Sequence, residues 1–442
     1  MREFVQTTVE YINLKKYQKM KKLIFILFVM SNAVYAQYED FEIDALVTPR
    51  KQGTVLTVGG EQADIQGFSN KSIQLAVDAL PVEGGTIKLD AGTFELKDAV
   101  RLRSNVSLIG SGPGTILKRA DGFKSRLIDD ADYAELKLMV EDASGFEPGM
   151  SVQIWDEPQS SCWDVSAGTI TDIQDNVIYI DSYLIRDYRA DHDGWVSNAG
   201  SGVLVQDAEN VVVSNLVIDG NKENHERVDG CNGGGVAILR SRNVTVDNVH
   251  VKDFNGEGIT WQITENVTVQ HCEVEGSGNI GLHPGTGSPK SRILNNNVHH
   301  NTVDGMFICW RVHHSMVKNN RFHHNGRHGI CTGHKDSDVI FEDNHIFENG
   351  SDGINLRDEN SRNSPHRNTF KKNLVENNGQ NGEGYGFAVY SSPQDLVIKD
   401  NIIRDTDKGT QKAGVFLQEN VPEVTMEGNE ISGHPDGEVI GK

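Results

Sequence analysis

The sequence predicts an all-β fold, a right-handed parallel β-helix, from two periodic markers and from the composition of the 442-residue chain. The first marker is a glycine followed by an apolar residue, with spacings of 23, 23, 24, 24, 24, 33 and 28 residues along Gly235, Gly258, Gly281, Gly305, Gly329, Gly353, Gly386 and Gly414. The second is an asparagine with a similar period, at Asn296, Asn320, Asn344, Asn373, Asn401 and Asn429. The 45 glycines against 11 prolines suit many tight turns between short strands. Repeats of this length are typical of coils that stack because one coil alone cannot bury its apolar face.

Within each repeat, apolar residues alternate with polar ones as they do in strands, for example at Val244 and Val246. We therefore expect each repeat to form one coil of three short strands with glycine and asparagine corners. The asparagine marker takes the place of Leu216, Val249 and Cys272 in earlier repeats. It predicts an inward-facing ladder in which each amide bonds the next, a structural role and not a catalytic one.

The segment before the repeats predicts a cap and the first coils. Residues 72–80 place Ile73, Ala76, Val77 and Leu80 at helical spacing, which favours a helix over the open end of the stack. Residues 125–200 break the period but contain short alternating stretches, and we expect a β-rich insertion there. The predicted segments are 1–36, an N-terminal extension with a signal peptide; 37–124, the cap helix and first coils; 125–200, the insertion; and 201–442, the main β-helix.

The N-terminal segment has the pattern of an export signal. Met20-Lys21-Lys22 is a basic start, residues 23–30 are an apolar run, and Val34-Tyr35-Ala36 offers small residues for cleavage after Ala36. The apolar run is too short to span a membrane. We therefore expect a secreted or periplasmic monomer without a membrane span.

The formal net charge of −21 argues against a nucleic-acid partner, which requires a basic surface. Any anionic ligand must then be met by a local cationic patch. The five cysteines are an odd number without a CxxC pair, so neither a zinc site nor a redox motif is indicated. Cys272 falls at an inward position, where we expect it to pack as a small buried residue.

The opening strings Gly84-Gly85-Thr86, Ala91–Phe94 and Ser104–Leu108, together with the later repeats, resemble the pectate-lyase-like superfamily of right-handed β-helix proteins over residues 55–440. The resemblance implies a polysaccharide lyase, glycoside hydrolase, epimerase or phage tailspike, and it identifies a fold more firmly than a substrate.

Motifs of individual families within that superfamily are incomplete here. Gly333-His334-Lys335 lacks the final glycine of the polygalacturonase Gly-His-Gly, and His283-Pro284 lacks the Asp-Pro-His of the mannuronan epimerases. Lys335 and Arg357 are one coil apart, which is similar to the Lys and Arg of the chondroitinase B and alginate lyase type.

Counted from each repeat glycine, positions +1 and +3 are apolar and should point inward, so positions +2 and +4 should point outward. Several outward and turn residues then lie along one stripe of the surface, across four or five coils. The stripe contains several cations, which is unusual for so acidic a chain. An anionic poly- or oligosaccharide is their natural complement. The expected catalytic residues are His334, Lys335, Arg357 and Tyr390, and the expected substrate-binding residues are His283, Trp310, Arg311, Asn355 and Glu359.

Such a stripe suits β-elimination at a uronic acid. We expect His334 or Lys335 to be the base, Arg311 and Arg357 to clamp the carboxylate, and Tyr390 to be the acid. A glycosidic leaving group would make the enzyme a polysaccharide lyase, and a hydroxyl would make it a dehydratase. One alternative is a glycoside hydrolase, and another is a non-catalytic carbohydrate-binding module. The carboxylates available to a hydrolase are Asp304, Asp352, Asp358 and Glu359.

Two further features stand apart from the stripe. His299-His300 and His323-His324 are 24 residues apart and should stack on another face, where repeat duplication explains them as well as metal binding does. We assign no metal ligands and leave a calcium requirement open. The long polar loop 221–232 is expected to wall the groove.

Overall fold

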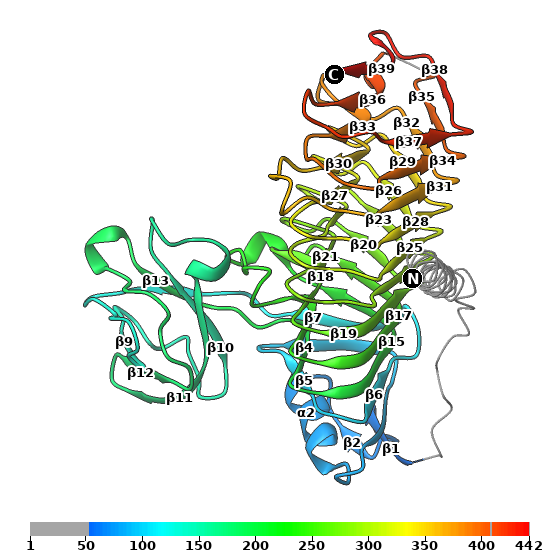
Figure 1. Cartoon of the computed structure of the whole chain (residues 1–442). Coiled ribbons are helices and arrows are strands. Elements are labelled where there is room, and N and C mark those ends of the chain that lie inside the picture. Colours follow the sequence, from blue (N-terminus) through cyan, green and yellow to red (C-terminus); the bar gives the residue numbers. More distant parts are fainter. Residues whose placement is uncertain (1–52, 407–408, 442) are drawn as a thin grey trace, which may run out of the picture. The chain divides into compact units, whose positions relative to one another are not determined.

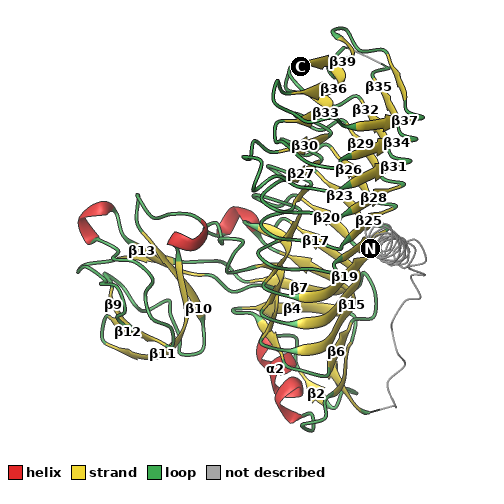
Figure 2. Ribbon diagram, in the orientation of Figure 1, coloured by secondary structure: helices red, strands yellow, loops and turns green. Residues whose placement is uncertain are grey.

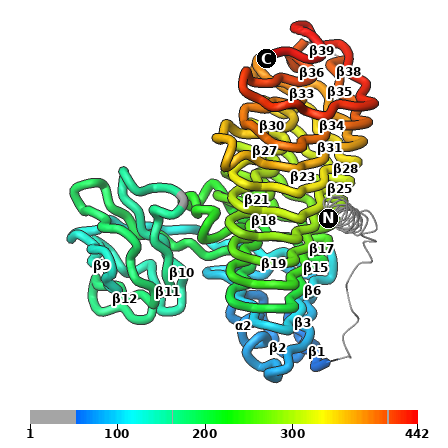
Figure 3. The backbone as a smooth tube through the Cα atoms, in the orientation of Figure 1, coloured from blue at the N-terminus to red at the C-terminus, as the bar shows by residue number. Residues whose placement is uncertain are grey.

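The computed structural model describes residues 53–406 and 409–441, so the expected signal peptide lies outside the described residues. The chain winds into coils whose strands pair in parallel with the coils before and after, as Figure 1 shows from blue to red. Figure 3 traces the same winding as a tube. Figure 2 shows that strands and loops make up nearly all of the described chain. The predicted all-β parallel β-helix is confirmed.

One outer wall of the coil stack is an eleven-stranded parallel sheet. Its strands are β5 (Val100–Leu102), β14 (Val203–Gln206), β16 (Gly234–Leu239), β18 (Glu257–Gln262), β21 (Leu282–Pro284), β24 (Met306–Phe307), β27 (Ile330–Thr332), β30 (Ile354–Leu356), β33 (Tyr385–Val389), β36 (Ala413–Leu417) and β39 (Gly437–Gly441).

The rest of the coil wall is a 22-stranded sheet. Its strands are β1 (Thr54–Gly59), β2 (Ile65–Gln66), β3 (Gly85–Leu89), β4 (Gly92–Leu96), β6 (Val106–Ile109), β7 (Thr115–Arg119), β15 (Glu209–Asp219), β17 (Arg242–Lys252), β19 (Glu265–Gln270), β20 (Glu273–Glu275), β22 (Arg292–Leu294), β23 (Asn297–His299), β25 (Met316–Lys318), β26 (Arg321–His323), β28 (Ile340–Glu342), β29 (His345–Phe347), β31 (Thr369–Lys371), β32 (Leu374–Glu376), β34 (Val397–Lys399), β35 (Ile402–Arg404), β37 (Thr425–Glu427) and β38 (Glu430–Ser432).

The core lies inside the coils, where like residues of successive coils pile on one another. Ile330 pairs with Ile354, which pairs with Phe387, and all three side chains are fully buried. Phe341 and Phe370 stack at 4.3 Å between ring centroids. Each fully buried apolar side chain contributes about 1.5–3 kcal/mol relative to exposure, so the stack is held mainly by this continuous column.

The predicted asparagine ladder is confirmed. At each rung a left-handed residue turns the corner, for example Asn319 with φ 58°, and the next residue points inward. The Asn320 amide donates to the Ile293 carbonyl at 2.8 Å and to Asn344 Oδ1 at 2.9 Å. The ladder therefore satisfies corner carbonyls that would otherwise be buried without partners. Cys272 begins it as a buried residue, as expected.

A second ladder, which the sequence analysis did not identify, lies at the next corner. Asn301, Asn325, Asn349 and Asn378 bond one another in the same way, with side-chain amides 2.9 Å from the next Oδ1. The series ends on Gln411, whose Oε1 accepts from Asn378 at 3.0 Å. Two of the corners of the later coils are therefore fixed by amide stacks.

The expected cap is helix α2 (Asn70–Ala79), close to the predicted 72–80. Ser69 caps its N-terminus, because its side chain accepts from the Ser72 backbone N–H in a capping box. Ile73, Ala76 and Val77 are buried against the first coils. The helix therefore covers apolar side chains that have no coil beyond them.

The insertion forms an antiparallel sheet in the order β8-β13-β10-β11-β12-β9. It has an apolar cluster of its own, which includes Val152, Ile154 and Val196. Its elements are β8 (Lys124–Arg126), β9 (Lys137–Met139), β10 (Ser151–Trp155), η1 (Cys162–Asp164), β11 (Ser166–Gln174), β12 (Val177–Ile180), η2 (Ala190–His192) and β13 (Trp195–Asn198), and a further short helix, η3 (Lys222–Asn224), lies in loop 221–232. Within the described residues, no helix has the length and apolarity needed to cross a membrane.

Candidate functional site

The candidate site is the outer surface of the eleven-stranded sheet. Positions +1 and +3 point inward as predicted, because Ile330 and Thr332 are fully buried. The outward +2 residues, however, are covered as well, since His283 and Asn355 are each 6% exposed. Their cover comes from other polar side chains on the same face.

The residue just before each repeat glycine belongs to this face, and sequence reasoning missed it. Glu257, Asp304, His328 and Asp352 occupy that position. Glu257 approaches the outward His283, Asp352 accepts from the outward Asn355, and His328 approaches Asp352. We call the whole group the outer polar layer, and it comprises Glu257, His283, Asp304, His328, Asp352, Asn355 and Arg357. The sequence signal that could have identified these residues is an acidic residue or a histidine directly before a repeat glycine.

Glu257 and His283 form the low-numbered end of the layer. Their closest oxygen and nitrogen, Oε1 and Nδ1, are 3.8 Å apart. Burial and the nearby Asp229 raise the pKa of Glu257 to about 8, whereas burial and the Arg357 charge lower the pKa of His283 to about 4. At neutral pH the pair is therefore a carboxylic acid beside a neutral imidazole, and not a salt bridge.

Several buried polar atoms in the layer lack a hydrogen-bond partner among the described residues: Glu257 Oε2, both ring nitrogens of His283, and Arg357 Nη2. Leaving such atoms unsatisfied costs about 1–3 kcal/mol each, and more for charged groups. In native proteins such atoms call for an explanation, such as a ligand, a bound water or a catalytic role. Four of them lie together on this face, which makes it the candidate site.

The centre of the layer is a fixed carboxylate network. Arg327 donates to both oxygens of Asp304, at 2.8 and 2.5 Å, and the His328 backbone N–H donates to the same carboxylate at 3.0 Å. Asp352 accepts from the Asn355 amide at 2.7 Å and from the Tyr385 backbone N–H at 2.9 Å. Both carboxylates are thus held by protein donors.

Arg357 reaches back across the sheet from the end of β30. Its Nη1 donates to the Ile308 carbonyl at 2.9 Å, and its Cζ lies 4.3 Å from the centre of the Phe307 ring. Asp336, fully buried, approaches Nη2 at 3.6 Å. Burial raises the pKa of Asp336 to about 7, so this carboxyl only partly neutralises the guanidinium at neutral pH. Arg357 therefore remains a cation available to an anionic ligand.

Tyr390 follows Arg357 in the +4 row, with its backbone N–H bonded to the Leu356 carbonyl at 3.0 Å. Burial and the nearby Asp352 raise the pKa of its phenol to about 12. The phenol therefore keeps its proton at neutral pH and acts as a donor.

The other predicted residues gather at the turn that follows the sheet. The His334 ring stacks on Trp310 at 4.5 Å, and its Nδ1 lies 3.3 Å from Glu359 Oε1. Arg311 is exposed and its backbone N–H bonds to the His334 carbonyl, while Lys335 occupies the left-handed turn position. The nine predicted residues thus form two groups, one on the sheet face (His283, Asn355, Arg357, Tyr390) and one at the turn (Trp310, Arg311, His334, Lys335, Glu359).

Comparison with known proteins agrees with this architecture. The family described as "Right handed beta helix region" matches residues 195–311 and 234–393. The chain is a right-handed parallel β-helix protein. Among solved structures, the A-module of mannuronan C-5 epimerase AlgE4 from Azotobacter vinelandii is similar, with 16% identity and a TM-score of 0.54 over 84% of this chain and 93% of that one.

Two other solved structures resemble this β-helix protein less closely. The AlgE6 A-module from Azotobacter vinelandii has 15% identity and a TM-score of 0.49, covering 84% of this chain and 93% of that one. An alginate lyase from Paenibacillus sp. has 11% identity and a TM-score of 0.47, covering 85% and 99%. At such identities the likeness shows the fold alone. No curated protein matches the sequence.

The histidine pairs of the β-helix lie on the 22-stranded sheet and not in the outer polar layer. His299 stacks on His323 at 4.8 Å, and His300 on His324 at 5.0 Å, as expected. Within each pair the Nδ1 atoms are 2.8 Å apart, so one ring donates to the other. In the described part of the chain, no group of three His, Cys, Asp or Glu residues is arranged to hold a metal ion.

Proposed function

We propose that this β-helix protein is a secreted or periplasmic enzyme that acts on an anionic, uronic-acid-containing polysaccharide or oligosaccharide by β-elimination. The observation that carries the proposal is the set of buried, unpartnered polar atoms on Glu257, His283 and Arg357. These atoms are a cation, a neutral base and a hydrogen-bond donor, which are the groups needed to remove a proton next to a carboxylate.

Arg357 is the proposed carboxylate clamp. Its guanidinium neutralises the negative charge of the uronate carboxylate, which lowers the pKa of the α-proton at C5. The protonated Glu257 carboxyl adds a donor for the same carboxylate or a neighbouring hydroxyl. A guanidinium suits this role because its planar donors match a carboxylate.

His283 is the proposed base, because its imidazole is neutral at neutral pH and neither nitrogen has a partner among the described residues. Both nitrogens are buried, so the side chains that cover them must move aside for the substrate to reach the base. His283 takes the C5 proton, and the electron pair of the C–H bond forms a double bond between C4 and C5. The C4–O bond breaks, and the protonated Glu257 carboxyl, whose Oε1 lies 3.8 Å from His283 Nδ1, gives its proton to the departing oxygen. Tyr390, the acid expected from the sequence, lies four strands along the sheet from His283, which at about 4.8 Å per strand is too far to act on the same sugar residue. A glycosidic oxygen yields a lyase product, and a hydroxyl leaves as water in a dehydratase.

His334 and Lys335 remain the rival bases at the turn. The His334 ring lies flat on Trp310 and faces Glu359, so part of its surface and one nitrogen are already occupied. We propose that the turn group instead binds the sugar chain, with Trp310 stacking on a ring face and Arg311 contacting an anionic substituent.

The hydrolase alternative has less support from the geometry. Hydrolysis requires two carboxyl groups free to act on the bond and on water. The Asp304 and Asp352 carboxylates are instead bound by Arg327, Asn355 and backbone N–H groups. Of the other two candidates, Asp358 is exposed and Glu359 lies 3.3 Å from His334, so a hydrolase would have to use this adjacent pair at the turn. The similarity to a C-5 epimerase gives a second outcome to test, since inversion at C5 also begins by removing the C5 proton.

The test is incubation of the purified protein with polymannuronate, polyguluronate, polygalacturonate, ulvan and glycosaminoglycans, in parallel with and without EDTA. Elimination produces absorbance near 235 nm, and the proposal expects it with at least one uronan. New reducing ends without this absorbance would overturn elimination in favour of hydrolysis. Deuterium uptake at C5 without absorbance would instead indicate epimerisation, and binding without any product would indicate a carbohydrate-binding module.

A further inference from the structure

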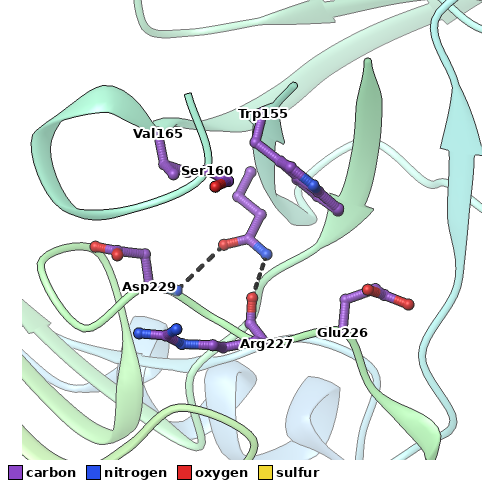
Figure 4. A pocket seen from close by; sticks show the side chains of 7 residues that line it. Trp155, Ser160, Val165, Glu226, Arg227 and Asp229 are labelled. Carbon is purple, nitrogen blue, oxygen red and sulfur yellow. Dashed lines mark hydrogen bonds between the residues drawn. The ribbon is translucent and has the colours of Figure 1, made fainter. Parts of the chain in front are cut away.

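A small open cavity lies where loop 221–232 meets strand β10 of the insertion. Its empty space is about 400 Å³ when the adjoining open solvent is included. It is lined by Gln153, Trp155, Ser160, Val165, Glu226, Arg227 and Asp229. Figure 4 shows these side chains arranged around the opening, with Trp155 and Arg227 on opposite sides. Without the open solvent the volume of the cavity is about 100 Å³, below the roughly 300 Å³ at which pockets that bury small ligands begin, so a sugar ring would rest against the wall of this hollow and stay partly in solvent.

The loop side of the cavity is built on a fixed backbone. Gln153 is buried, its amide donates to the Arg227 carbonyl at 2.6 Å, and its Oε1 accepts from the Asp229 backbone N–H at 3.3 Å. Figure 4 draws both bonds. The insertion thus holds loop 221–232 in place at the positions that carry the charged side chains.

The same loop borders the outer polar layer. The Thr260 hydroxyl donates to the Gly230 carbonyl at 2.8 Å, and a methyl group at Gly230 would lie 1.9 Å from Glu257 Cδ. Asp229 raises and Arg227 lowers the pKa of Glu257. The cavity therefore lies next to the Glu257 end of the outer polar layer. Asp229, which lines the cavity, directly precedes Gly230, which lies against Glu257.

The lining combines an aromatic ring and one cation with two carboxyl groups: Glu226, which is paired with Lys124 at 2.9 Å, and the buried Asp229. Trp155 is half-buried, and within the described residues its indole makes neither a ring-stacking nor a cation–π contact. Arg227 is exposed and forms no salt bridge within the described chain. A free indole face suits the apolar face of a sugar ring, and a free guanidinium suits a carboxylate or sulfate.

We infer that this cavity is a substrate subsite, in which Trp155 stacks on a sugar ring and Arg227 binds its carboxylate or sulfate. The inference rests on the proposed function, because the sugar bound here belongs to the same chain whose next residues cross Glu257 and His283. In this interpretation the insertion forms part of the substrate-binding groove.

The experiment compares W155A and R227Q with wild type on oligosaccharides of increasing length, prepared from the most active uronan of the substrate screen. We expect KM to rise at least tenfold for chains long enough to reach the cavity, with kcat within twofold. The shortest cleaved chain should show no change. The matched controls are W163A, an exposed tryptophan elsewhere on the insertion, and R240Q, a surface arginine paired with Asp207.

Equal KM values for variants and controls would overturn the subsite, as would the same rise at every chain length.

Retention in gels cast with the same polysaccharide gives a readout independent of turnover. There, H283N should bind like wild type while W155A and R227Q bind less. Loss of turnover in H283N with unchanged binding by W155A and R227Q would refute the subsite and leave the proposed function standing. Weakened binding by these two variants without turnover in wild type would support the subsite and refute the proposed chemistry.

Discussion

His283 and Arg357 contact the same phenyl ring, although they belong to coils that are three strands apart. The His283 ring lies 5.7 Å from the Phe307 ring centre in an edge contact, and the Arg357 guanidinium lies 4.3 Å from it. Phe307 thus separates a neutral imidazole from a cation on one face of the sheet. A uronate spanning this ring would meet the cation with its carboxylate and the imidazole with its α-proton.

Replacing His283 by asparagine should reduce turnover by about 10²–10⁴-fold, the usual contribution of a general base. The H334A variant is the matched control and should retain activity within about fivefold if the turn group only binds substrate. Because the pKa of His283 is lowered to about 4, its base form is lost only as pH falls through that value. The acidic limb of kcat/KM should therefore lie near pH 4 and persist in H334A, and a wild-type limb that H334A abolishes would contradict the assignment.

Glu257 should make the protein less stable as pH rises. Its pKa is raised to about 8 in the folded state from an ordinary 4.5. Between these values the folded state binds the proton that the unfolded state has released, so stability is fully present below about 4.5 and declines as pH rises toward 8. E257Q should flatten this slope in urea titrations at pH 5 to 8, and an unchanged slope would contradict the raised pKa.

Removing the Arg357 charge should affect both folding and substrate binding. In R357M the buried Asp336 loses its partner, which should lower the free energy of unfolding by about 3 kcal/mol. The double variant R357M/D336N should regain most of this stability without regaining activity. Recovery of activity together with stability would show that Arg357 serves only the fold.

The amide ladder can be tested at a single rung. N320A removes the donor to the Ile293 carbonyl and to Asn344, and should lower the free energy of unfolding by about 2 kcal/mol or more. N297A is a suitable control, because Asn297 lies outside the ladder and is only partly buried. Equal unfolding midpoints in urea for the two variants would contradict a structural role for the ladder.

The coil repeat could be predicted because each coil imposes the same inward pattern on its sequence. The periodic glycines and the Asn296 series therefore predicted the stacking and one ladder. The second ladder has the same spacing of 24 between Asn301 and Asn325, and the same argument would have found it. Alternation along strands likewise predicted that His283, Asn355 and Arg357 share the outer face.

The sequence could not predict which side chains cover the outer face of the eleven-stranded sheet. Glu257 is the first residue of β18 and Asp304 lies just before β24, and at the start of a strand simple alternation does not say on which side a residue points. The burial of His283 depends on neighbours such as Glu257 and on packing against Phe307, which lie in other coils. The cavity beside Glu257 depends on how loop 221–232 meets the insertion, and such contacts carry no periodic signal.

In the two sheets of the β-helix, the backbone of each coil pairs with the coil before it and the coil after it. Duplicating or deleting one 24-residue unit outside the segment from Phe307 to Arg357 would therefore lengthen or shorten the wall by about 4.8 Å without altering the backbone pairing of the other coils. For an enzyme that acts as proposed, the number of sugar residues along the wall would therefore change in whole steps during evolution. Specificity for chain length and the chemistry at His283 can then vary independently of each other.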